Sequence, residues 1–263
     1  MTQVAINGAA GRMGQRLVAL TIEDQALQLA AAIEQPGHPQ LGTDAGQLAG
    51  AGEAGVPLAA ELTASPAVMI DFTGPEGMRQ SLEQCVDRGI ALVIGSTGFS
   101  EDDERAIDQA GQRIAVLQAP NMSLGVNLLF ALAGQVAAKL GDDYDIEIVE
   151  GHHRFKKDAP SGTALGIARS ICDATDKDPD STIKHGRQGA DPRETGQIGM
   201  HALRLGDEVG RHSVHFGTLG EELTLGHKAN TRDVFVRGAL RAAKWLVEQK
   251  PGRYSMKDVL GLE

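Results

Sequence analysis

The sequence predicts an α/β protein that consists of an N-terminal domain with a parallel sheet and a second, α+β domain with a mixed sheet. Three observations predict it. Strand-like and helical runs alternate through residues 1–121, a glycine-rich turn joins the first strand to the first helix, and three strand-like runs follow one another within residues 198–227. We expect one domain from residues 1–121 and 232–263, and the other from residues 122–231.

The turn between the first strand and the first helix is rich in glycine. The β-prone run Gln3–Asn7 leads into Gly8–Gly14, and the helical pattern Gln15–Leu20 follows directly. Glycines in such a turn permit the close approach of a pyrophosphate, which then rests on the helix N-terminus. Glu34 ends the next apolar run, 20 residues after Gly14, where an acid can bind a ribose. We therefore predict a Rossmann-like dinucleotide-binding domain; the alternatives are a glycine-rich turn beside an incidental acid, and a flavin site.

Further apolar runs in this half end in small polar residues, at Val68–Thr73, Ala91–Gly98 and Ile114–Asn121. Buried parallel strands meet a ligand at their carboxyl ends, so we expect the first two ends to face the cofactor. The third is expected to border the nicotinamide, the alternative being a plain crossover to the next domain. The Gly- and Ala-rich connection Gly37–Gly55 is expected to include a mobile loop.

The segment His152–Thr163 combines five potential cations with a Pro-Ser-Gly-Thr run. A strand-like run, Ile146–Glu150, precedes it, and a helical run, Ala164–Arg169, follows it. The first backbone N–H groups of that helix would point at a ligand, and the helix dipole favours negative charge there. We predict a site for a small carboxylate; the alternative is a solvated basic loop with an ordinary Ser or Thr cap.

The other elements of the second domain are a helix that Ser123 can cap, running to about Leu140, and a polar stretch, Asp176–Gly196, that is expected to be a flexible loop. Three strands of a meander are then expected, with turns at Gly206-Asp207 and at Thr218–Gly220. These strands are Ile198–Leu205, Val209–Phe216 and Glu222–His227. A last helical period covers Arg232–Gln249 and ends before Pro251.

The composition excludes several classes of protein. The net charge of −10 argues against broad nucleic-acid binding. The most apolar stretch, Val126–Leu140, is interrupted by polar residues, so we expect no membrane span. The N-terminus lacks the blocks of a secretory signal, and a soluble, cytoplasmic protein is expected. Cys85 and Cys172 match no metal or redox motif and are expected to be unreactive thiols.

A metal site built on His212 and His215 is not expected. Residues three apart on a strand face opposite sides, and no Cys or acidic ligand completes the set. We expect these histidines to be solvated or packed on the sheet.

The chain resembles, from end to end, the 4-hydroxy-tetrahydrodipicolinate reductase family, also called dihydrodipicolinate reductase, of bacterial lysine and diaminopimelate biosynthesis. The segments that carry the resemblance are Gly8–Gly14, Asp71–Thr73, Gly95–Phe99, Asn121–Asn127, His152–Thr163 and Met256–Leu260. The central segment, His152–Thr163, is the most specific of them.

The resemblance implies roles for individual residues. His152 corresponds to the family's proton donor or acceptor and Lys156 to its second proton donor. The groups that would hold the substrate carboxylates are His153, Ser161, Gly162 and Thr163. The cofactor would be lined by Gly8, Ala9, Ala10, Gly11, Arg12, Met13, Gly95, Ser96, Thr97, Ala119, Pro120, Asn121 and Met122, with Glu34 on the adenosine ribose.

This chain departs from the family's pattern at Phe155, where many relatives carry a polar residue, and at Lys157, which adds a second lysine. The spacing from Asp158 favours Lys156 as the working one. Relatives that use NADPH well often follow the ribose-binding acid with Arg, whereas Gln35 and Pro36 follow it here. A neutral amide cannot offset the repulsion between Glu34 and a 2′-phosphate, so we expect NADH to be preferred. Arg12 could keep NADPH usable.

The resemblance implies NAD(P)H-dependent reduction of 4-hydroxy-tetrahydrodipicolinate, a small dicarboxylate, by an enzyme that forms homotetramers through its second domain. A histidine with a pKa near 6.5 suits the proton transfer that accompanies hydride addition. Two alternatives remain: a reductase of a different small dicarboxylate, and a non-catalytic NAD(P)H-binding redox sensor.

Overall fold

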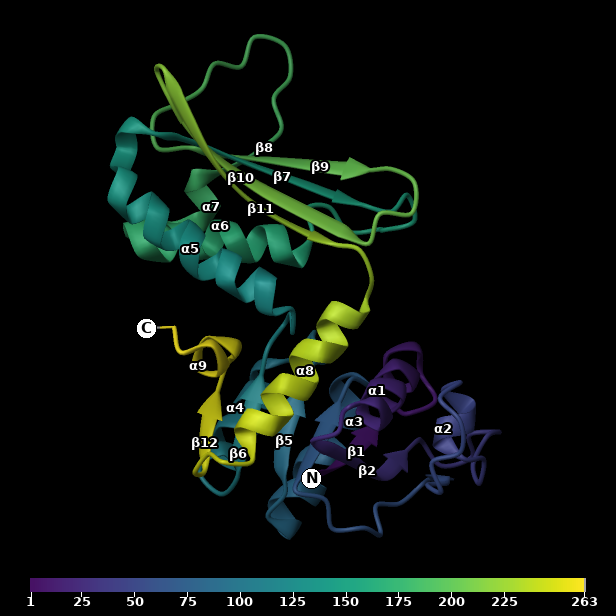
Figure 1. Cartoon of the computed structure of the whole chain (residues 1–263). Helices are drawn as coiled ribbons and strands as arrows, with labels where there is room; N and C mark the ends of the chain where they lie inside the picture. Colours follow the sequence, from purple (N-terminus) through teal and green to yellow (C-terminus); the bar gives the residue numbers. More distant parts are fainter. Residues whose placement is uncertain (263) are drawn as a thin grey trace. The chain divides into compact units, whose positions relative to one another are not determined.

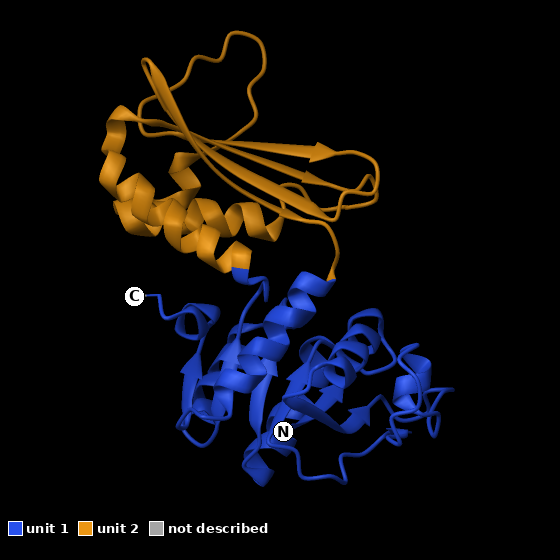
Figure 2. Cartoon of the chain, viewed as in Figure 1, with its two compact units in different colours: residues 1–124, 233–263 blue, residues 125–232 orange. Residues whose placement is uncertain are grey.

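The computed structural model describes residues 1–262, which divide into two compact units (Figure 2). Unit 1 comprises residues 1–124 and the part of the described chain from residue 233 onward, and unit 2 comprises residues 125–232. The chain therefore leaves unit 1 once, builds unit 2 from one continuous segment, and returns.

Unit 1 is built on a seven-stranded sheet with the order β12-β6-β5-β4-β1-β2-β3 (Figure 1), and every neighbouring pair in it is parallel. The strand order reverses between β1 and β4, as in dinucleotide-binding sheets. This confirms the Rossmann-like fold. The strands are β1 (Thr2–Asn7), β2 (Leu27–Ile33), β3 (Leu58–Ala59), β4 (Val68–Asp71), β5 (Ala91–Ile94), β6 (Ala115–Gln118) and β12 (Gly252–Tyr254).

Helices cover both faces of this sheet, which is why β4 and β5 are buried along their whole length and are apolar except for Asp71 at the end of β4. One face packs against α1 and α8 through residues such as Leu17 and Leu240. The other packs against α3 and α4 through residues such as Met78 and Ile107. The helices of unit 1 are α1 (Arg12–Glu23), α2 (Ala45–Leu48), α3 (Pro75–Arg88), α4 (Glu101–Gly111), α8 (Asp233–Leu246) and α9 (Met256–Leu260).

The connection expected to include a mobile loop contains the short helix α2. Asp44 caps this helix, because its carboxylate accepts the backbone N–H groups of Gln47 and Ala54 at 3.0 Å each and that of Val56 at 3.2 Å. The Gly- and Ala-rich composition hid this local structure.

Unit 2 holds a five-stranded mixed sheet with the order β11-β10-β7-β9-β8. Its strands are β7 (Asp145–His152), β8 (Ile183–His185), β9 (Ile198–Arg204), β10 (Gly210–Thr218) and β11 (Glu221–Ala229). Strand β10 is antiparallel to β7 and β11, whereas β9 is parallel to β7 and β8. This confirms the mixed sheet.

The predicted meander is wrong for its first strand. Strands β10 and β11 form the expected hairpin, but β7 lies between β9 and β10. Strand β7 carries the buried Ile146 and Ile148 and needs partners on both sides, so the connection through Gly206 joins strands that are not neighbours. The expected flexible loop after Asp176 is also wrong in part, because it contains α7 (Pro179–Thr182) and β8, which pairs with β9.

Two helices, α5 (Leu124–Leu140) and α6 (Gly162–Thr175), cover one face of the unit 2 sheet (Figure 1). Leu129 and Ala133 of α5 and Ile167 of α6 pack with sheet residues such as Phe216. Figure 2 shows no helix on the opposite face. A short 3₁₀ turn, Gly141–Asp143, follows α5.

One helical stretch, Leu124–Asp143, is long and apolar enough to cross a membrane by length and composition, although the sequence was expected to contain none. This is weak evidence, because the core helix of a globular unit passes the same test. The stretch contains α5, whose Leu129, Ala133 and Ala137 pack in the core of unit 2.

Candidate active site

The glycine turn after β1 has a backbone that side chains would disrupt. Gly8 has a φ of +74°, a conformation that favours glycine. A Cβ on Gly14 would lie 2.0 Å from the Gly8 carbonyl oxygen. Gly11 precedes α1 without a side-chain cap, so the first N–H groups of the helix stay open to an anion. These features fit the pyrophosphate of a dinucleotide.

Glu34 lies beside this turn, directly after β2. Its Oε2 accepts the Ala10 backbone N–H at 3.2 Å, and its Oε1 accepts that of Gln35 at 3.0 Å. The neighbours that follow, Gln35 and Pro36, are exposed and uncharged, and Arg12 is exposed at the start of α1. An adenosine ribose at this position would therefore meet the carboxylate of Glu34, while residues 35 and 36 offer it no positive charge.

A buried carboxylate joins the carboxyl ends of three adjacent strands, and the sequence did not reveal it. Asp71, at the end of β4, has no exposed surface. It accepts hydrogen bonds from Asn7 Nδ2 at 2.8 Å, Ser81 Oγ at 2.7 Å and Ser96 Oγ at 3.0 Å. The Ser96 hydroxyl thus holds β5 to β4, while Thr97 and Gly98 beside it are exposed. The cluster fixes the edge of the sheet at which a cofactor would bind.

The remaining residues predicted to line the cofactor are divided by burial. Ala9, Ala119 and Met122 have side chains in the core of unit 1 and can offer a ligand their backbone. Met13 and Asn121 are half-buried, and Pro120 is exposed. Gly95 packs on the ring of Phe72, because a Cβ there would lie 2.3 Å from it.

A cavity of about 640 Å³ opens at the carboxyl ends of β5, β6 and β12. Three of the predicted cofactor residues line it, Ser96, Thr97 and Pro120. Arg253 closes one side of it and pairs with Glu104 and Asp108 of α4. The volume of this cavity is large enough for a ring of the size of nicotinamide.

In unit 2, the cationic segment starts at the end of β7 around a buried carboxylate. Glu150 has no exposed side-chain surface, and its Oε2 lies 2.6 Å from His152 Nδ1. Arg204 of β9 donates to both carboxylate oxygens, at 2.9 and 2.8 Å. The Ser161 N–H also donates to it, at 3.1 Å. Burial alone would raise the pKa of Glu150, but Arg204 and His152 hold it below its usual value.

The rest of the segment carries the other predicted substrate groups. Lys156 Nζ lies 2.9 Å from Asp158 Oδ1, and this contact lowers the pKa of Asp158. Lys156 is largely buried, whereas Phe155 and Lys157 are exposed. Nδ1 of His153 is buried and has no hydrogen-bond partner within residues 1–262. The structure therefore separates the two lysines and favours Lys156 for a fixed role.

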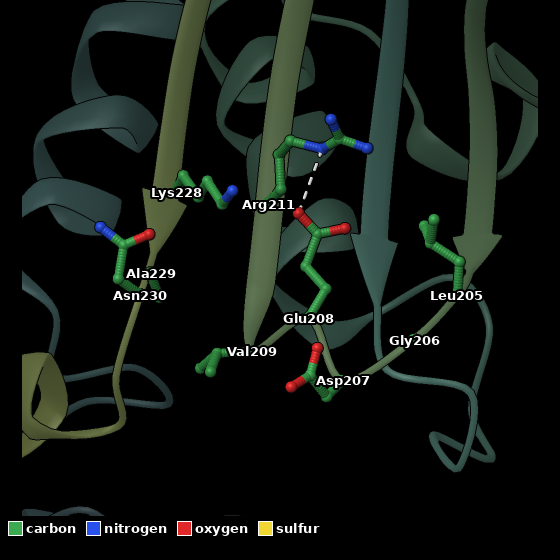
Figure 3. Close-up of a pocket in the computed structure, with 9 residues that line it drawn as sticks. All are labelled: Leu205, Gly206, Asp207, Glu208, Val209, Arg211, Lys228, Ala229 and Asn230. Atoms are coloured by element: carbon green, nitrogen blue, oxygen red, sulfur yellow. Dashed lines mark ion pairs between the residues drawn. The ribbon is translucent and has the colours of Figure 1, made fainter.

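The connection between β9 and β10 lies against this segment. The backbone N–H of His153 donates to the Glu208 carbonyl at 2.7 Å, and that of Arg154 donates to the Gly206 carbonyl at 3.1 Å. Figure 3 shows the pocket of about 490 Å³ at this end of the sheet, with Glu208 paired to Arg211 at 3.4 Å and Lys228 nearby on β11. The backbone bonds fix where the cationic segment lies.

Helix α6 begins directly after Ser161, whose hydroxyl accepts the Ala164 N–H at 3.1 Å. The same hydroxyl lies 3.0 Å from Nε2 of His212, and Ser161 is buried. Its predicted contact with the substrate stays a prediction, but the hydroxyl already serves as the helix cap. Gly162 is exposed and a Cβ on it would meet nothing, so the helix start beside Thr163 is accessible to an anion.

The pKa values of two histidines at the site, His152 and His212, lie below that of free histidine. Burial lowers the pKa of His152, although the carboxylate of Glu150 acts in the opposite direction. Burial and the neighbouring His152 lower the pKa of His212 to about 4. Their rings lie edge to face with centroids 5.2 Å apart. His215 lies elsewhere, paired with Glu222 at 2.7 Å.

The low pKa of His212 predicts a pH-dependent stability. Unfolded histidine has a pKa near 6.5, so as the pH falls from about 6.5 to about 4 the unfolded chain gains a proton that the folded chain does not. We expect His212 to lower the free energy of unfolding by up to about 3 kcal/mol across that window. Urea unfolding at a series of pH values should show a shallower pH dependence for His212→Asn; equal dependence in both proteins would contradict the assignment.

The part of the chain that the structure describes contains no group of three or more His, Cys, Asp or Glu side chains placed to hold a metal. Cys85 and Cys172 are buried free thiols. Burial raises the pKa of Cys85 to about 12 and also raises that of Cys172. The buried position and raised pKa of both thiols agree with the expectation of unreactive cysteines.

Sequence patterns assigned no role in the site to Glu150 or Arg204, and expected of His212 only that it be solvated or packed on the sheet, where it is indeed buried. Each sits on a different strand, and the pairing of β7 with β9 and β10 brings them together. Glu150 and His152 did carry a signal, because residues two apart on a strand share a face.

Two family models match the chain. One is described as "Dihydrodipicolinate reductase, N-terminus" and covers residues 2–122; the other is described as "Dihydrodipicolinate reductase, C-terminus" and covers residues 125–260. Two relatives are named 4-hydroxy-tetrahydrodipicolinate reductase. That of Magnetococcus marinus is 49% identical over 99% of both chains, and that of Citrifermentans bemidjiense is 45% identical over 100% of both.

Solved structures agree in fold. The dipicolinate-bound dihydrodipicolinate reductase from Paenisporosarcina sp. TG-14 aligns with a TM-score of 0.78 at 26% identity, over 98% of this chain and 99% of that one. An amine dehydrogenase from Mycobacterium smegmatis aligns with a TM-score of 0.65 at 12% identity, over 97% and 95% of the two chains, which shows the fold alone.

Proposed function

The chain belongs to the dihydrodipicolinate reductase family, and we propose that it reduces 4-hydroxy-tetrahydrodipicolinate to tetrahydrodipicolinate with NAD(P)H and loss of water, in the diaminopimelate route to lysine. The observation that carries the proposal is the cationic connection of unit 2, with its imidazole, its lysine and an accessible helix start within one short segment. The glycine turn of unit 1 supplies the site for the dinucleotide.

Unit 1 is proposed to bind the cofactor and unit 2 the substrate. The backbone of the glycine turn would hold the pyrophosphate, Glu34 the adenosine ribose, and the cavity beside Thr97 and Pro120 the nicotinamide. When bound, the reduced nicotinamide supplies the hydride. The protein's part in this unit is to bind and orient it.

In unit 2 the two carboxylates of the substrate would be held by His153 and by the start of α6 at Gly162 and Thr163. A dianion is a fitting ligand there, because the segment concentrates positive charge in a chain of net charge −10. His152 is proposed to give the proton that accompanies hydride addition, and Lys156 to add fixed positive charge or a second proton.

An assay of NADH oxidation tests the function. The chain is mixed with NADH and enzymatically generated 4-hydroxy-tetrahydrodipicolinate, and then with other small dicarboxylates, while the NADH absorbance band is followed. Rapid oxidation with the first acceptor supports the proposal. Turnover of another dicarboxylate alone would identify a different reductase, and binding without oxidation would identify a redox sensor.

We expect the enzyme to use both coenzymes and to prefer NADH. Glu34 would repel a 2′-phosphate, and the uncharged Gln35 offers no compensating cation, while the exposed Arg12 keeps NADPH usable. The measurement is kcat/KM for each coenzyme at saturating substrate. A clearly higher kcat/KM for NADPH would contradict this prediction, and Gln35→Arg should shift the ratio towards NADPH.

Lys156→Ala is expected to lower turnover by at least about tenfold with the fold intact. Lys156 is largely buried beside Asp158, so its charge would be held in place at the proposed substrate site. The exposed Lys157 provides the matched control, and Lys157→Ala should retain near-normal turnover. If steady-state kinetics show near-normal turnover in Lys156→Ala, that lysine has no such role.

A homotetramer in the cytoplasm completes the proposal. The face of the unit 2 sheet that carries no helix is lined by polar side chains such as His201, His215 and Thr224, and it offers a surface for assembly. Sedimentation equilibrium measures the number of chains in the assembly.

A further inference from the structure

Glu150 is the point at which the parts of the unit 2 site are joined. Its side chain has no exposed surface, yet it accepts four hydrogen bonds from three separate segments of the chain. A buried carboxylate without such hydrogen-bond partners would be strongly destabilising. Losing any one of these hydrogen bonds is therefore costly, and the groups that donate them are held firmly in place. We propose that Glu150 is a positioning residue that fixes both the proton-donating imidazole of His152 and the first turn of α6; this rests on the function proposed above.

The contact with His152 selects one orientation of the imidazole. Nδ1 faces Glu150 at 2.6 Å, so Nε2 on the other side of the ring is the nitrogen that can exchange a proton with a substrate. A Cβ on Gly210 would come within 3.1 Å of that Nε2. Because residue 210 is glycine, it places no side chain in the space beside Nε2, the ring nitrogen that points away from Glu150.

The contact with Ser161 extends the same control to the helix. Glu150 Oε1 accepts the Ser161 N–H at 3.1 Å, and the Ser161 hydroxyl caps the Ala164 N–H at 3.1 Å. The positions of Gly162 and Thr163 follow from those two bonds. The carboxylate of Glu150 therefore fixes the position of the proposed proton donor, His152, relative to the groups proposed to bind the substrate.

Arg204 keeps Glu150 ionised and also binds the loop that contains Asp158. It donates to both oxygens of Glu150 and also to the Asp158 carbonyl at 2.6 Å. The other charged groups that act on His152 are Lys156 in the loop and Arg204 on β9. His212 on β10 lies edge to face with the ring, and His227 on β11 acts on His212. Glu150 is the negatively charged group within hydrogen-bond distance of the His152 ring, and its charge stabilises the imidazolium.

The test is Glu150→Gln, which keeps the shape and removes the charge. His152 as an acid acts in its protonated form, so activity falls as the pH rises through its pKa. In the variant this fall in kcat/KM should begin at a pH lower by about one unit or more. KM for the dicarboxylate should rise at least about fivefold, while KM for NADH stays within about twofold.

Glu222→Gln is the matched control, because it removes the carboxylate from another His–Glu pair of the same sheet, His215–Glu222. It should leave the pH profile unchanged. Glu150→Gln leaves Arg204 without its partner, so a double variant, Glu150→Gln with Arg204→Met, removes both charges and guards against misfolding. Circular dichroism and NADH binding check the fold of each protein.

An unshifted pH profile and an unchanged KM for the dicarboxylate in a folded Glu150→Gln or double variant would overturn the inference. Its failure is distinguishable from failure of the proposed function by His152→Ala. If that variant is inactive while the Glu150 variants are normal, His152 keeps its role and the positioning by Glu150 is refuted. If His152→Ala is itself near normal, the proposed proton donor is wrong.

Discussion

Replacing His152 with alanine is expected to lower kcat by at least about tenfold and by as much as ~10⁴-fold, the range that positioned acid catalysis commonly contributes. The reason is geometric. The imidazole is held by Glu150 at 2.6 Å and lies beside the proposed anion-binding segment, where water would be a weaker and less ordered proton source. Steady-state kinetics with NADH and 4-hydroxy-tetrahydrodipicolinate measure the effect.

Binding measurements provide the control for this variant. NADH and dipicolinate, the ligand bound in the Paenisporosarcina structure, should each bind His152→Ala within about threefold of the unmodified protein, because neither interaction needs the transferred proton. Near-normal kcat would remove His152 from its role. A loss of dipicolinate binding that equals the loss of kcat/KM would show that His152 binds the substrate and does not deliver the proton.

Gly14→Ala is expected to weaken NADH binding at least about tenfold and to lower the free energy of unfolding by about 1–3 kcal/mol. The added Cβ would lie 2.0 Å from the Gly8 carbonyl oxygen and 2.6 Å from Ala9 Cα, so the turn and α1 must move apart. That movement displaces the N–H groups that would hold the pyrophosphate. Fluorescence titration with NADH and urea unfolding give the two values.

Gly217→Ala is the matched control, since a Cβ on Gly217 meets no atom within 4 Å. It should leave NADH binding unchanged. Normal affinity in Gly14→Ala would show that the glycine turn does not hold the dinucleotide, because no conformation of the present turn accommodates the methyl group without a shift.

The sequence predicted unit 1 well because its signals are local. Strands β4 and β5 read as short apolar runs since both faces of a parallel sheet are covered, and the glycine turn lies between neighbouring elements. Unit 2 was harder. The short turn at Gly206 suggests neighbouring strands, but the placement of β7 between β9 and β10 depends on contacts between residues more than fifty positions apart.

The candidate site could likewise be predicted only where its residues are neighbours in the sequence. Residues His152 to Thr163 stand out as one cationic segment, and their order along the chain reveals them. Arg204 and His212 do not stand out, because they reach Glu150 and Ser161 through strand pairing. Asp71 likewise looks like one more polar strand end, and the bonds from Asn7 and Ser96 that make it a central acceptor are long-range.

The central claim is that the dinucleotide of unit 1 passes its hydride directly to a dicarboxylate held by the cationic segment of unit 2. Its most direct test is mass spectrometry of the product formed with NADH deuterated at C4 of the nicotinamide, each stereoisomer taken separately in ordinary water. The account predicts that one stereoisomer transfers its deuterium to tetrahydrodipicolinate and the other transfers hydrogen. An unlabelled product with both stereoisomers would contradict it.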